Sequence, residues 1–255
     1  MSLLAPGEPP AVTTVRENGE SDLFLVCDHA SNRIPAALGD LGLPDHERQR
    51  HIAWDIGAAG VARRLSEMLD ATLVEQGYSR LVIDANRQPA LPTAMPMVSE
   101  VTEIPGNARL TEFDRKIRVD EVFTPYHDEI TRLLDARVAA GRRTVLVAVH
   151  SFTPVFKGQQ RPWHIGIMYN RDPRIGQALL PLMREEPGLT VGENEPYTVD
   201  DENDYTIPVH GERRGLPHVE LELRQDLLSD EAGQADWADR LGRLLPRAAQ
   251  LALGD

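Results

Sequence analysis

Two histidines in this sequence follow apolar runs that have the composition of buried strands. His29 lies in the stretch LFLVCDHASNRIP, residues 23–35, and His150 ends the run TVLVAVH, residues 144–150. Ligands in open α/β sheets gather outside the carboxyl ends of the strands. Two histidines and a carboxylate with an open fourth position form a catalytic zinc site. The pattern therefore predicts one shared metal site; the alternative is that each histidine only caps its own strand.

The third ligand has two candidates. Asp55, in HIAWDIGA, is flanked by apolar residues, which is an unfavourable environment for an unpaired carboxylate. The alternative for Asp55 is that it caps a helix beginning near Ala58. Asn32 follows His29 closely, but a neutral amide is a poor zinc ligand. Asp28 could instead orient a histidine from outside the ligand set.

Apolar and charged residues alternate along HVELELR, residues 218–224. This period of two predicts a strand whose charged face carries Glu220 and Glu222. On a sheet covered on both sides, these carboxylates would need partners. A glutamate beside a zinc-bound water would act as general base and then return the proton to the leaving amine. The alternative is an edge strand with a solvated face.

Asn86 and Arg87 follow the apolar run RLVID, residues 80–84. The planar guanidinium group of arginine binds carboxylates in bidentate fashion, so this pair could hold an acidic substrate. The alternative is a structural salt bridge from Arg87 to Asp84 or Glu75.

Arg213 and Arg214, in the loop HGERRGLPH, could close over an anionic group or form an ordinary solvated turn. Ser151 and Asn32 complete the candidate substrate-binding residues. A serine hydrolase has no support, because the sequence contains no G-x-S-x-G motif. Cys27 lies inside an apolar run, where cysteine is usually inert packing.

Composition limits the partners. The net charge of −13 disfavours binding to nucleic acid or to an anionic membrane. No apolar run approaches the ~20 residues that span a bilayer, and the N-terminus lacks the pattern of a signal peptide. The single cysteine excludes a thiolate-based structural zinc site and fits a reducing compartment. We expect a cytoplasmic protein.

Strand and helix patterns alternate along the 255 residues. The predicted strands are 23–27, 71–76, 80–84, 144–150, 164–169 and 218–223. The predicted helices are 58–69, 111–140 with a break or kink at Pro125, 172–186 and 231–253. This alternation predicts an α/β fold of three layers, α/β/α, around a mixed, mostly parallel sheet. Residues 1–20 are expected to be a flexible lead-in, residues 21–255 a single domain, and residues 88–110 a long ordered loop.

Six stretches of the chain resemble the N-formylglutamate amidohydrolases, in particular their shorter members. They are VCDHASNRIP, HIAWDIGA, YSRLVIDANRQP, FDRKIRVDEVFTPYH, VHSFTPVF and GLPHVELELRQDLL, in order from Leu23 to Leu228. The resemblance implies a phosphorylase/hydrolase-like fold, distantly similar to zinc carboxypeptidases and aspartoacylases. It also implies zinc-dependent hydrolysis of an N-acyl amino acid, with N-formyl-L-glutamate as the namesake substrate.

The resemblance also assigns roles. His29 and His150 match the two ligand histidines of the family, and Glu222 matches the glutamate that acts as base. Asn86 and Arg87 match the pair that holds the substrate carboxylate in the carboxypeptidase-like relatives.

The chain departs from these relatives at the first ligand. Carboxypeptidases and aspartoacylases have a ligand glutamate where this chain has Asn32. The amidohydrolases proper carry a motif similar to PHSG where this chain reads CDHASN. They also have an aspartate near the position of Asp55, which favours Asp55 as the third ligand.

The first hypothesis is a metallohydrolase with one zinc, or another divalent metal, per chain. It would cleave a small anionic N-acyl amino acid and would bind neither nucleic acid nor membrane, as a monomer or homodimer. The second is a metal-free binding protein on a degenerate hydrolase scaffold, which Asn32 supports. The third is a metallohydrolase of a different N-acyl or carboxylate substrate.

Overall fold

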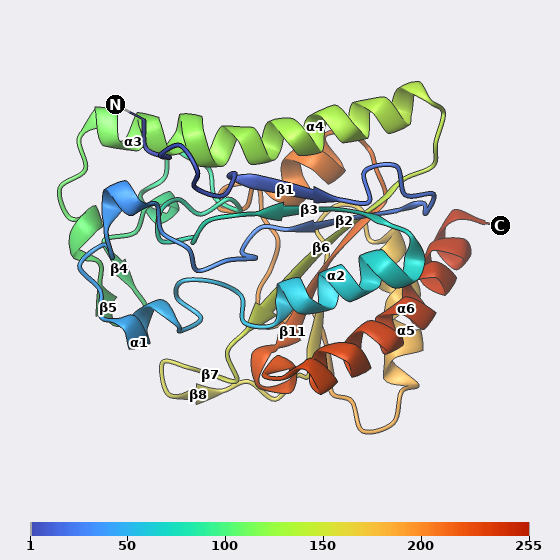
Figure 1. The fold of residues 1–255 in the computed structure, drawn as a ribbon. Helices are drawn as coiled ribbons and strands as arrows, with labels where there is room; N and C mark the ends of the chain where they lie inside the picture. Colours follow the sequence, from blue (N-terminus) through green and yellow to red (C-terminus); the bar gives the residue numbers. More distant parts are fainter. Residues whose placement is uncertain (1, 255) are drawn as a thin grey trace.

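A seven-stranded sheet forms the centre of the protein, whose computed structural model describes residues 2–254 (Figure 1). The strand order is β1-β3-β2-β6-β11-β9-β10. The strands are β1 (Val12–Val15), β2 (Leu23–Cys27), β3 (Thr72–Gln76), β6 (Val145–Phe152), β9 (Ile165–Met168), β10 (Val191–Glu193) and β11 (His218–Arg224). Only the pairs β1–β3 and β9–β11 are antiparallel, and the other neighbours run parallel. The predicted mixed, mostly parallel sheet is confirmed.

Helices cover both faces of this sheet, which gives the predicted three layers (Figure 1). The helices are α1 (Asp45–Arg48), α2 (Ala58–Leu69), α3 (Glu112–Arg118), α4 (Thr124–Ala139), α5 (Arg174–Arg184) and α6 (Glu231–Leu253). Helices α2, α5 and α6 pack with Leu25, Val147 and Leu221 in one core. Helix α4 packs with Phe24 and Leu146 on the other face. Strand β6 is buried along its whole length, as its unbroken apolar run predicts.

The predicted helix 111–140 forms as three consecutive helical segments. Thr111 caps α3 in a capping box with Asp114. A π-helical segment, Val119–Phe123, then joins α3 to α4, and Pro125 lies in the first turn of α4. Proline is tolerated in the first turn of an α-helix, where its missing N–H removes no α-helical hydrogen bond. A second π-helical segment spans Ile207–Glu212.

The predicted strand at 80–84 is wrong. These residues form turns, in which the amide of Val82 bonds to the carbonyl of Ser79 and the amide of Asp84 to that of Ala94. Leu81, Val82 and Ile83 are buried in a cluster of loop side chains and not in the sheet. Burial in a loop core and burial in a strand produce the same apolar pattern in the sequence.

The N-terminal segment also differs from the flexible lead-in that was expected. Strand β1 pairs with β3 at the edge of the sheet, and Leu3 is buried. The backbone amides of Leu3 and Leu4 donate to the carboxylate of Glu121. Leu3, Leu4 and strand β1 therefore contact the rest of the domain.

The segment 88–110 is an ordered loop, as expected. It contains the short hairpin β4 (Val98–Ser99) and β5 (Thr102–Glu103), and 3₁₀ turns at Pro92–Ala94 and Pro105–Asn107. The chain also has 3₁₀ turns at Ala36–Leu38 and Gln225–Leu228, and a second hairpin, β7 (Val155–Phe156) and β8 (Gln159–Gln160). Within residues 2–254, no helix is long and apolar enough to cross a membrane.

Candidate active site

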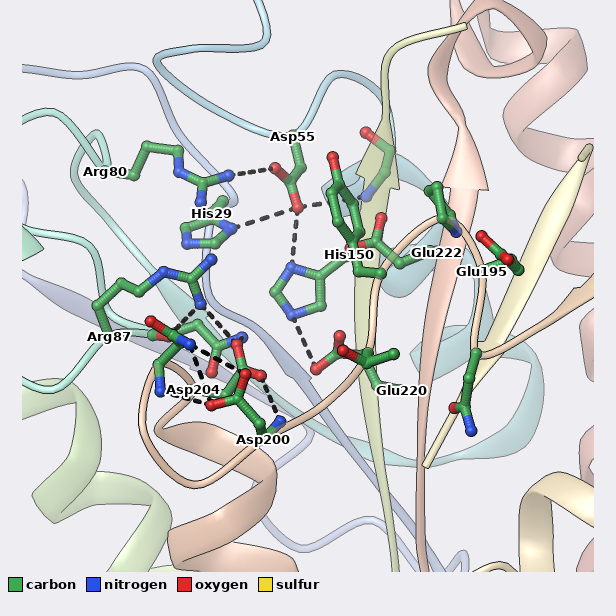
Figure 2. Close-up of a pocket in the computed structure, with 17 residues that line it drawn as sticks. His29, Asp55, Arg80, Arg87, His150, Glu195, Asp200, Asp204, Glu220 and Glu222 are labelled. Carbon is green, nitrogen blue, oxygen red and sulfur yellow. Dashed lines mark hydrogen bonds and ion pairs between the residues drawn. The ribbon is translucent and has the colours of Figure 1, made fainter. Parts of the chain in front are cut away.

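Three adjacent parallel strands bring the predicted site residues together. Strands β2, β6 and β11 lie side by side, so their carboxyl ends meet at one edge of the sheet. His29 follows β2, His150 lies near the end of β6, and Glu220 and Glu222 lie on β11. Asp55 comes from the loop before α2. These residues line a cavity of about 480 Å³, which the segment 194–204 also borders (Figure 2).

The carboxylate of Asp55 is the centre of this cluster (Figure 2). Its Oδ2 atom lies 3.3 Å from Nδ1 of His29 and 2.9 Å from Nδ1 of His150. Oδ2 also accepts a hydrogen bond from the amide of Ser151, and Oδ1 lies 3.3 Å from Arg80. Burial opposes ionisation, but the two histidines outweigh it and hold the pKa of Asp55 well below its usual range. Asp55 therefore carries a negative charge.

Asp55 does not cap α2. The residue at the N-cap of this helix is Gly57, and no side chain accepts a hydrogen bond from the first turn. The left-handed φ of +81° at Gly57 suits glycine, and a Cβ atom there would lie 2.3 Å from Cβ of Leu228. The capping alternative for Asp55 is therefore wrong.

Each histidine has a second carboxylate on its outer ring nitrogen. Nε2 of His29 lies 2.8 Å from Oδ1 of Asp84, and Nε2 of His150 lies 3.0 Å from Oδ2 of Asp28. Burial disfavours the charged imidazolium, but the neighbouring carboxylates raise the pKa of both histidines. Carboxylates in this position fix the orientation and tautomer of histidines that bind metals.

The donor set fits a divalent cation. One ligand atom each from His29, Asp55 and His150 lies within 4.8 Å of the others, and all three residues are buried. Two imidazole nitrogens and one carboxylate oxygen are a ligand set that zinc takes in catalytic sites, with a further position left for water or substrate. The three residues predicted as metal ligands are thus brought together.

Glu220 and Glu222 lie on the same face of β11, and both side chains are buried. Burial raises the pKa of each to about 8. Oε2 of Glu220 is 4.0 Å from Nε2 of His150. Because β11 lies between β6 and β9, the edge-strand alternative is wrong. A carboxyl group with so high a pKa can hold and release a proton near neutral pH.

Asn86, Arg87 and Ser151 also line the cavity. Nη1 of Arg87 lies 2.5 Å from Oδ1 of Asp204. Arg87 therefore pairs with neither Asp84 nor Glu75, whose partners are Arg80 and Arg63 respectively. The alternative of a structural salt bridge from Arg87 to Asp84 or Glu75 is therefore wrong, and Arg87 lies in the cavity wall.

Side chains of Asn86 and Ser151 hold the surrounding loops. The carboxamide oxygen of Asn86 accepts hydrogen bonds from the amides of Tyr205 and Thr206. The hydroxyl of Ser151 donates to the carbonyl of Ile56, one residue after Asp55. Both contacts therefore help to fix the segments that carry the cavity wall.

Three candidates are not brought to the cavity. The side-chain amide of Asn32 donates to the carbonyl of Arg48 at the end of α1, so it does not join the metal ligands. Arg214 pairs with Asp135 on α4, and Arg213 is exposed. The loop that carries these arginines follows the π-helical segment Ile207–Glu212, and neither arginine is among the residues that line the cavity. Asn32, Arg213 and Arg214 therefore do not line the cavity that the other candidate residues share.

Sequence reasoning missed Arg80, Asp204 and Tyr197, which all line the cavity. Arg80 bridges Asp55 and Asp84, but the sequence places it at the start of a supposed strand. Asp204 lies in the acidic run VDDEND, residues 199–204, whose charges need cationic partners. The excess of negative charge in this run could have indicated that Asp204 pairs with an arginine elsewhere in the chain. No sequence pattern singled out Tyr197.

The comparisons with known proteins agree with this geometry. Residues 21–229 match the model of the family described as N-formylglutamate amidohydrolase. The gene product Atu2144 from Agrobacterium tumefaciens has a similar solved structure, with 42% identity and a TM-score of 0.94, covering 97% of this chain and 98% of that one. An N-formylglutamate amidohydrolase from Ralstonia eutropha JMP134 shares the fold at 18% identity, with a TM-score of 0.67, covering 97% and 100% of the two chains. No match was found among curated proteins. The chain belongs to the N-formylglutamate amidohydrolase family.

Proposed function

We propose that this protein is a zinc-dependent amidohydrolase that deacylates an N-acyl acidic amino acid. N-formyl-L-glutamate is the proposed substrate, with glutamate and formate as products. One observation carries the proposal: Nδ1 of His29, Oδ2 of Asp55 and Nδ1 of His150 converge beside two buried glutamates in one cavity. Membership of the family supports the same activity.

His29, Asp55 and His150 hold the metal ion in this proposal. When bound, the ion supplies Lewis-acid activation of the acyl carbonyl and of a water molecule. Asp84 would hold the His29 ring toward the ion by accepting a hydrogen bond from its Nε2 atom. Asp28 would hold the His150 ring as an ion-pair partner, 3.0 Å from its Nε2 atom.

Glu222 is the proposed general base. Among the charges that act on Glu222 are those of Asp55 and Arg80, whereas Asp204 and Asp28 act on Glu220. Glu222 is the register partner of His150 on the neighbouring strand, and Oε2 of Glu220 lies 4.0 Å from the outer nitrogen of His150. A nearby cation lowers the pKa of a carboxyl group, which favours ionised Glu222 in the loaded site. Glu222 takes a proton from the attacking water and gives it to the nitrogen of the departing amine.

Arg87 is the proposed partner of the substrate α-carboxylate. Its Nη1 atom is engaged by Asp204 and by the carbonyl of Asn86. An arginine has five N–H donors in a planar fork, so the remaining donors are available to a ligand. This contact positions the scissile amide relative to the metal ligands.

The metal-free binding protein loses its support, because Asn32 lies outside the ligand cluster. A metallohydrolase of another N-acyl substrate uses the same metal ligands and base. Formate release from N-formyl-L-glutamate, compared with acetate release from N-acetyl-L-glutamate, distinguishes the acyl groups. Zinc-dependent formate release supports the proposal, and release of neither product by the zinc-loaded protein contradicts it.

A further inference from the structure

A second cavity of about 360 Å³ adjoins the active-site cavity. The two cavities share three lining residues: Arg80, Arg87 and Tyr197. The two cavities therefore border the same three side chains. Phe156, from strand β7, lines the second cavity only.

The carboxylates that line the second cavity already have cationic partners. Asp84 lies 2.6 Å from Arg80, and Glu100 lies 2.5 Å from Arg50. Neither acid therefore adds an unbalanced negative charge. The first cavity is lined by six carboxyl groups, of which Asp55 and Asp204 pair with Arg80 and Arg87. The other four, Glu195, Asp200, Glu220 and Glu222, have no arginine or lysine partner within residues 2–254. A substrate carboxylate is better accommodated on the side of the second cavity.

Arg161 contacts two residues of the cavity walls: Tyr197, which both cavities share, and Phe156 of the second cavity. Its guanidinium carbon lies 4.6 Å from the ring centre of Phe156 and 4.7 Å from that of Tyr197. Nη1 donates a 2.8 Å hydrogen bond to the hydroxyl of Tyr197. Its backbone amide bonds to the carbonyl of Pro154, which fixes the β7–β8 hairpin. The guanidinium carbon also lies 5.8 Å from the ring centre of Phe152, so the side chain contacts three aromatic rings.

Arg161 has no carboxylate partner within residues 2–254, unlike Arg80 and Arg87. Besides the larger effect of burial, its charge lowers the pKa of Glu222 in the first cavity and of His51 in the second. An arginine stacked on aromatic rings keeps the N–H groups at its edge for a planar anion.

We infer that Arg161 binds the side-chain carboxylate of the substrate beside Tyr197, a residue of the wall that the two cavities share. This inference rests on the proposed function and names its specificity residue. Arg87 and Arg161 then hold the two carboxylates of an N-acylated dicarboxylic amino acid, with the amide directed to the metal ligands.

The test compares N-formyl-L-glutamate with N-formyl-L-glutamine, which is neutral at the side chain. Arg161→Gln lowers kcat/KM for the glutamate substrate by roughly 10- to 100-fold, mainly through KM, because a hydrogen-bonded charge is lost. The same variant changes kcat/KM for the glutamine substrate by less than about twofold, because the neutral side chain of this substrate makes no ion pair with Arg161 that the variant could remove. Arg161→Lys retains part of the preference, because it keeps the charge but not the planar fork. Equal losses on both substrates, or no loss, overturn the inference.

Lys157→Gln is the matched control. Lys157 lies on the same hairpin, with Nζ 5.3 Å from the ring centre of Phe156, and it is exposed. Lys157→Gln removes one positive charge, as Arg161→Gln does, but we expect it to leave the preference for the glutamate substrate over the glutamine substrate unchanged. A loss of preference in Lys157→Gln would mean that the general field, and not a contact with Arg161, selects the substrate.

A binding measurement separates this inference from the proposed function. Calorimetry compares glutarate with its monoamide, glutaramate, on the native protein and on Arg161→Gln. Tighter binding of glutarate that disappears in the variant supports the inference, even if no N-formyl substrate is hydrolysed. Equal binding of the two probes, or binding of neither, overturns the inference, whereas formate release alone decides the proposed function.

Discussion

Nδ1 of His150 lies 2.9 Å from Oδ2 of Asp55, although the two residues are 95 positions apart in the chain. The same oxygen also faces Nδ1 of His29 at 3.3 Å. One buried carboxylate thus holds two imidazole rings that come from neighbouring parallel strands. This arrangement brings three potential metal ligands, His29, Asp55 and His150, to one point in the cavity.

Replacing Asp28 by asparagine is expected to weaken zinc binding without abolishing it. Oδ2 of Asp28 faces the outer nitrogen of His150, and Oδ1 accepts hydrogen bonds from Tyr126 and Thr206. Asparagine keeps the shape but loses the charge, so we expect zinc affinity to fall by roughly 10- to 100-fold. Competition with a chromogenic chelator measures this change.

The control for this variant is Asp200→Asn. Asp200 lines the same cavity, but its side chain accepts hydrogen bonds from Glu202 and Asn203 in its own loop. The Asp200→Asn variant therefore removes one carboxylate charge from the cavity without changing a contact to either histidine. Equal zinc affinity in Asp28→Asn and the native protein would contradict the role of Asp28.

Glu222→Gln is expected to keep zinc but to lose turnover. If Glu222 transfers the proton, kcat falls by roughly 10²- to 10⁴-fold, the usual effect of losing a general base. Glu220→Gln, on the same face of β11, has a smaller effect because Glu220 faces the outer side of His150. Formate release and zinc content are measured on the same preparations. Full activity in Glu222→Gln would remove Glu222 from the mechanism.

The sequence predicted this cluster because its main elements are simple. Long apolar runs identify β2 and β6, and strict alternation identifies β11, so the residues at their ends could be expected at one edge of a parallel sheet. Asp55 was recognisable as a carboxylate in apolar surroundings. Asn32 was misjudged because spacing along the chain does not give the direction of a side chain after a turn.

The residues Tyr197, Arg161 and Arg80 could not be predicted from strand patterns. Tyr197 and Arg161 lie in irregular segments, whose paths depend on contacts between distant parts of the chain and not on a local period. The run at 80–84 was mistaken for a strand because its burial comes from other loops. Arg80, which begins that run, was consequently missed as a partner of Asp55.

A buried pair of histidines is expected to make stability depend on pH. Nε2 of His127 donates to the carbonyl of Ala85, so its Nδ1 accepts from Nε2 of His210 at 2.9 Å. Burial lowers the pKa of His127 to about 4 and of His210 to about 3. An unfolded histidine titrates near ~6.5, so as pH falls below that value the unfolded state takes up protons that the folded state refuses. Each histidine then costs about 2 kcal/mol of stability at pH ~5.

Denaturant unfolding at about pH 7 and pH 5 tests this pair. His210→Gln removes one of the two titrating groups, so we expect it to lose about 2 kcal/mol less than the native protein over this interval. His46→Gln is the control, because His46 is exposed on α1. An identical pH dependence in His210→Gln and the native protein would show that the pair does not titrate in this way.

Gly166 is expected to be intolerant of a side chain. A Cβ atom there would lie 1.9 Å from the carbonyl oxygen of Glu195, in the segment that borders the active-site cavity. Gly166→Ala therefore displaces this segment, lowering both the free energy of unfolding, by about 1–3 kcal/mol, and kcat/KM. Gly141→Ala has open space, so its cost is limited to the left-handed φ of +65° and its kcat/KM is unchanged. Native activity in Gly166→Ala would contradict the close packing of this segment.

Metal analysis of the purified protein tests the central claim most directly. The native protein is compared with the double variant His29→Ala, His150→Ala after both have been supplied with zinc and dialysed. We predict about one zinc per chain in the native protein, consistent with one three-ligand cluster, and none in the variant. A native protein that retains no metal, or a double variant that retains as much as the native protein, would contradict the assignment of this site.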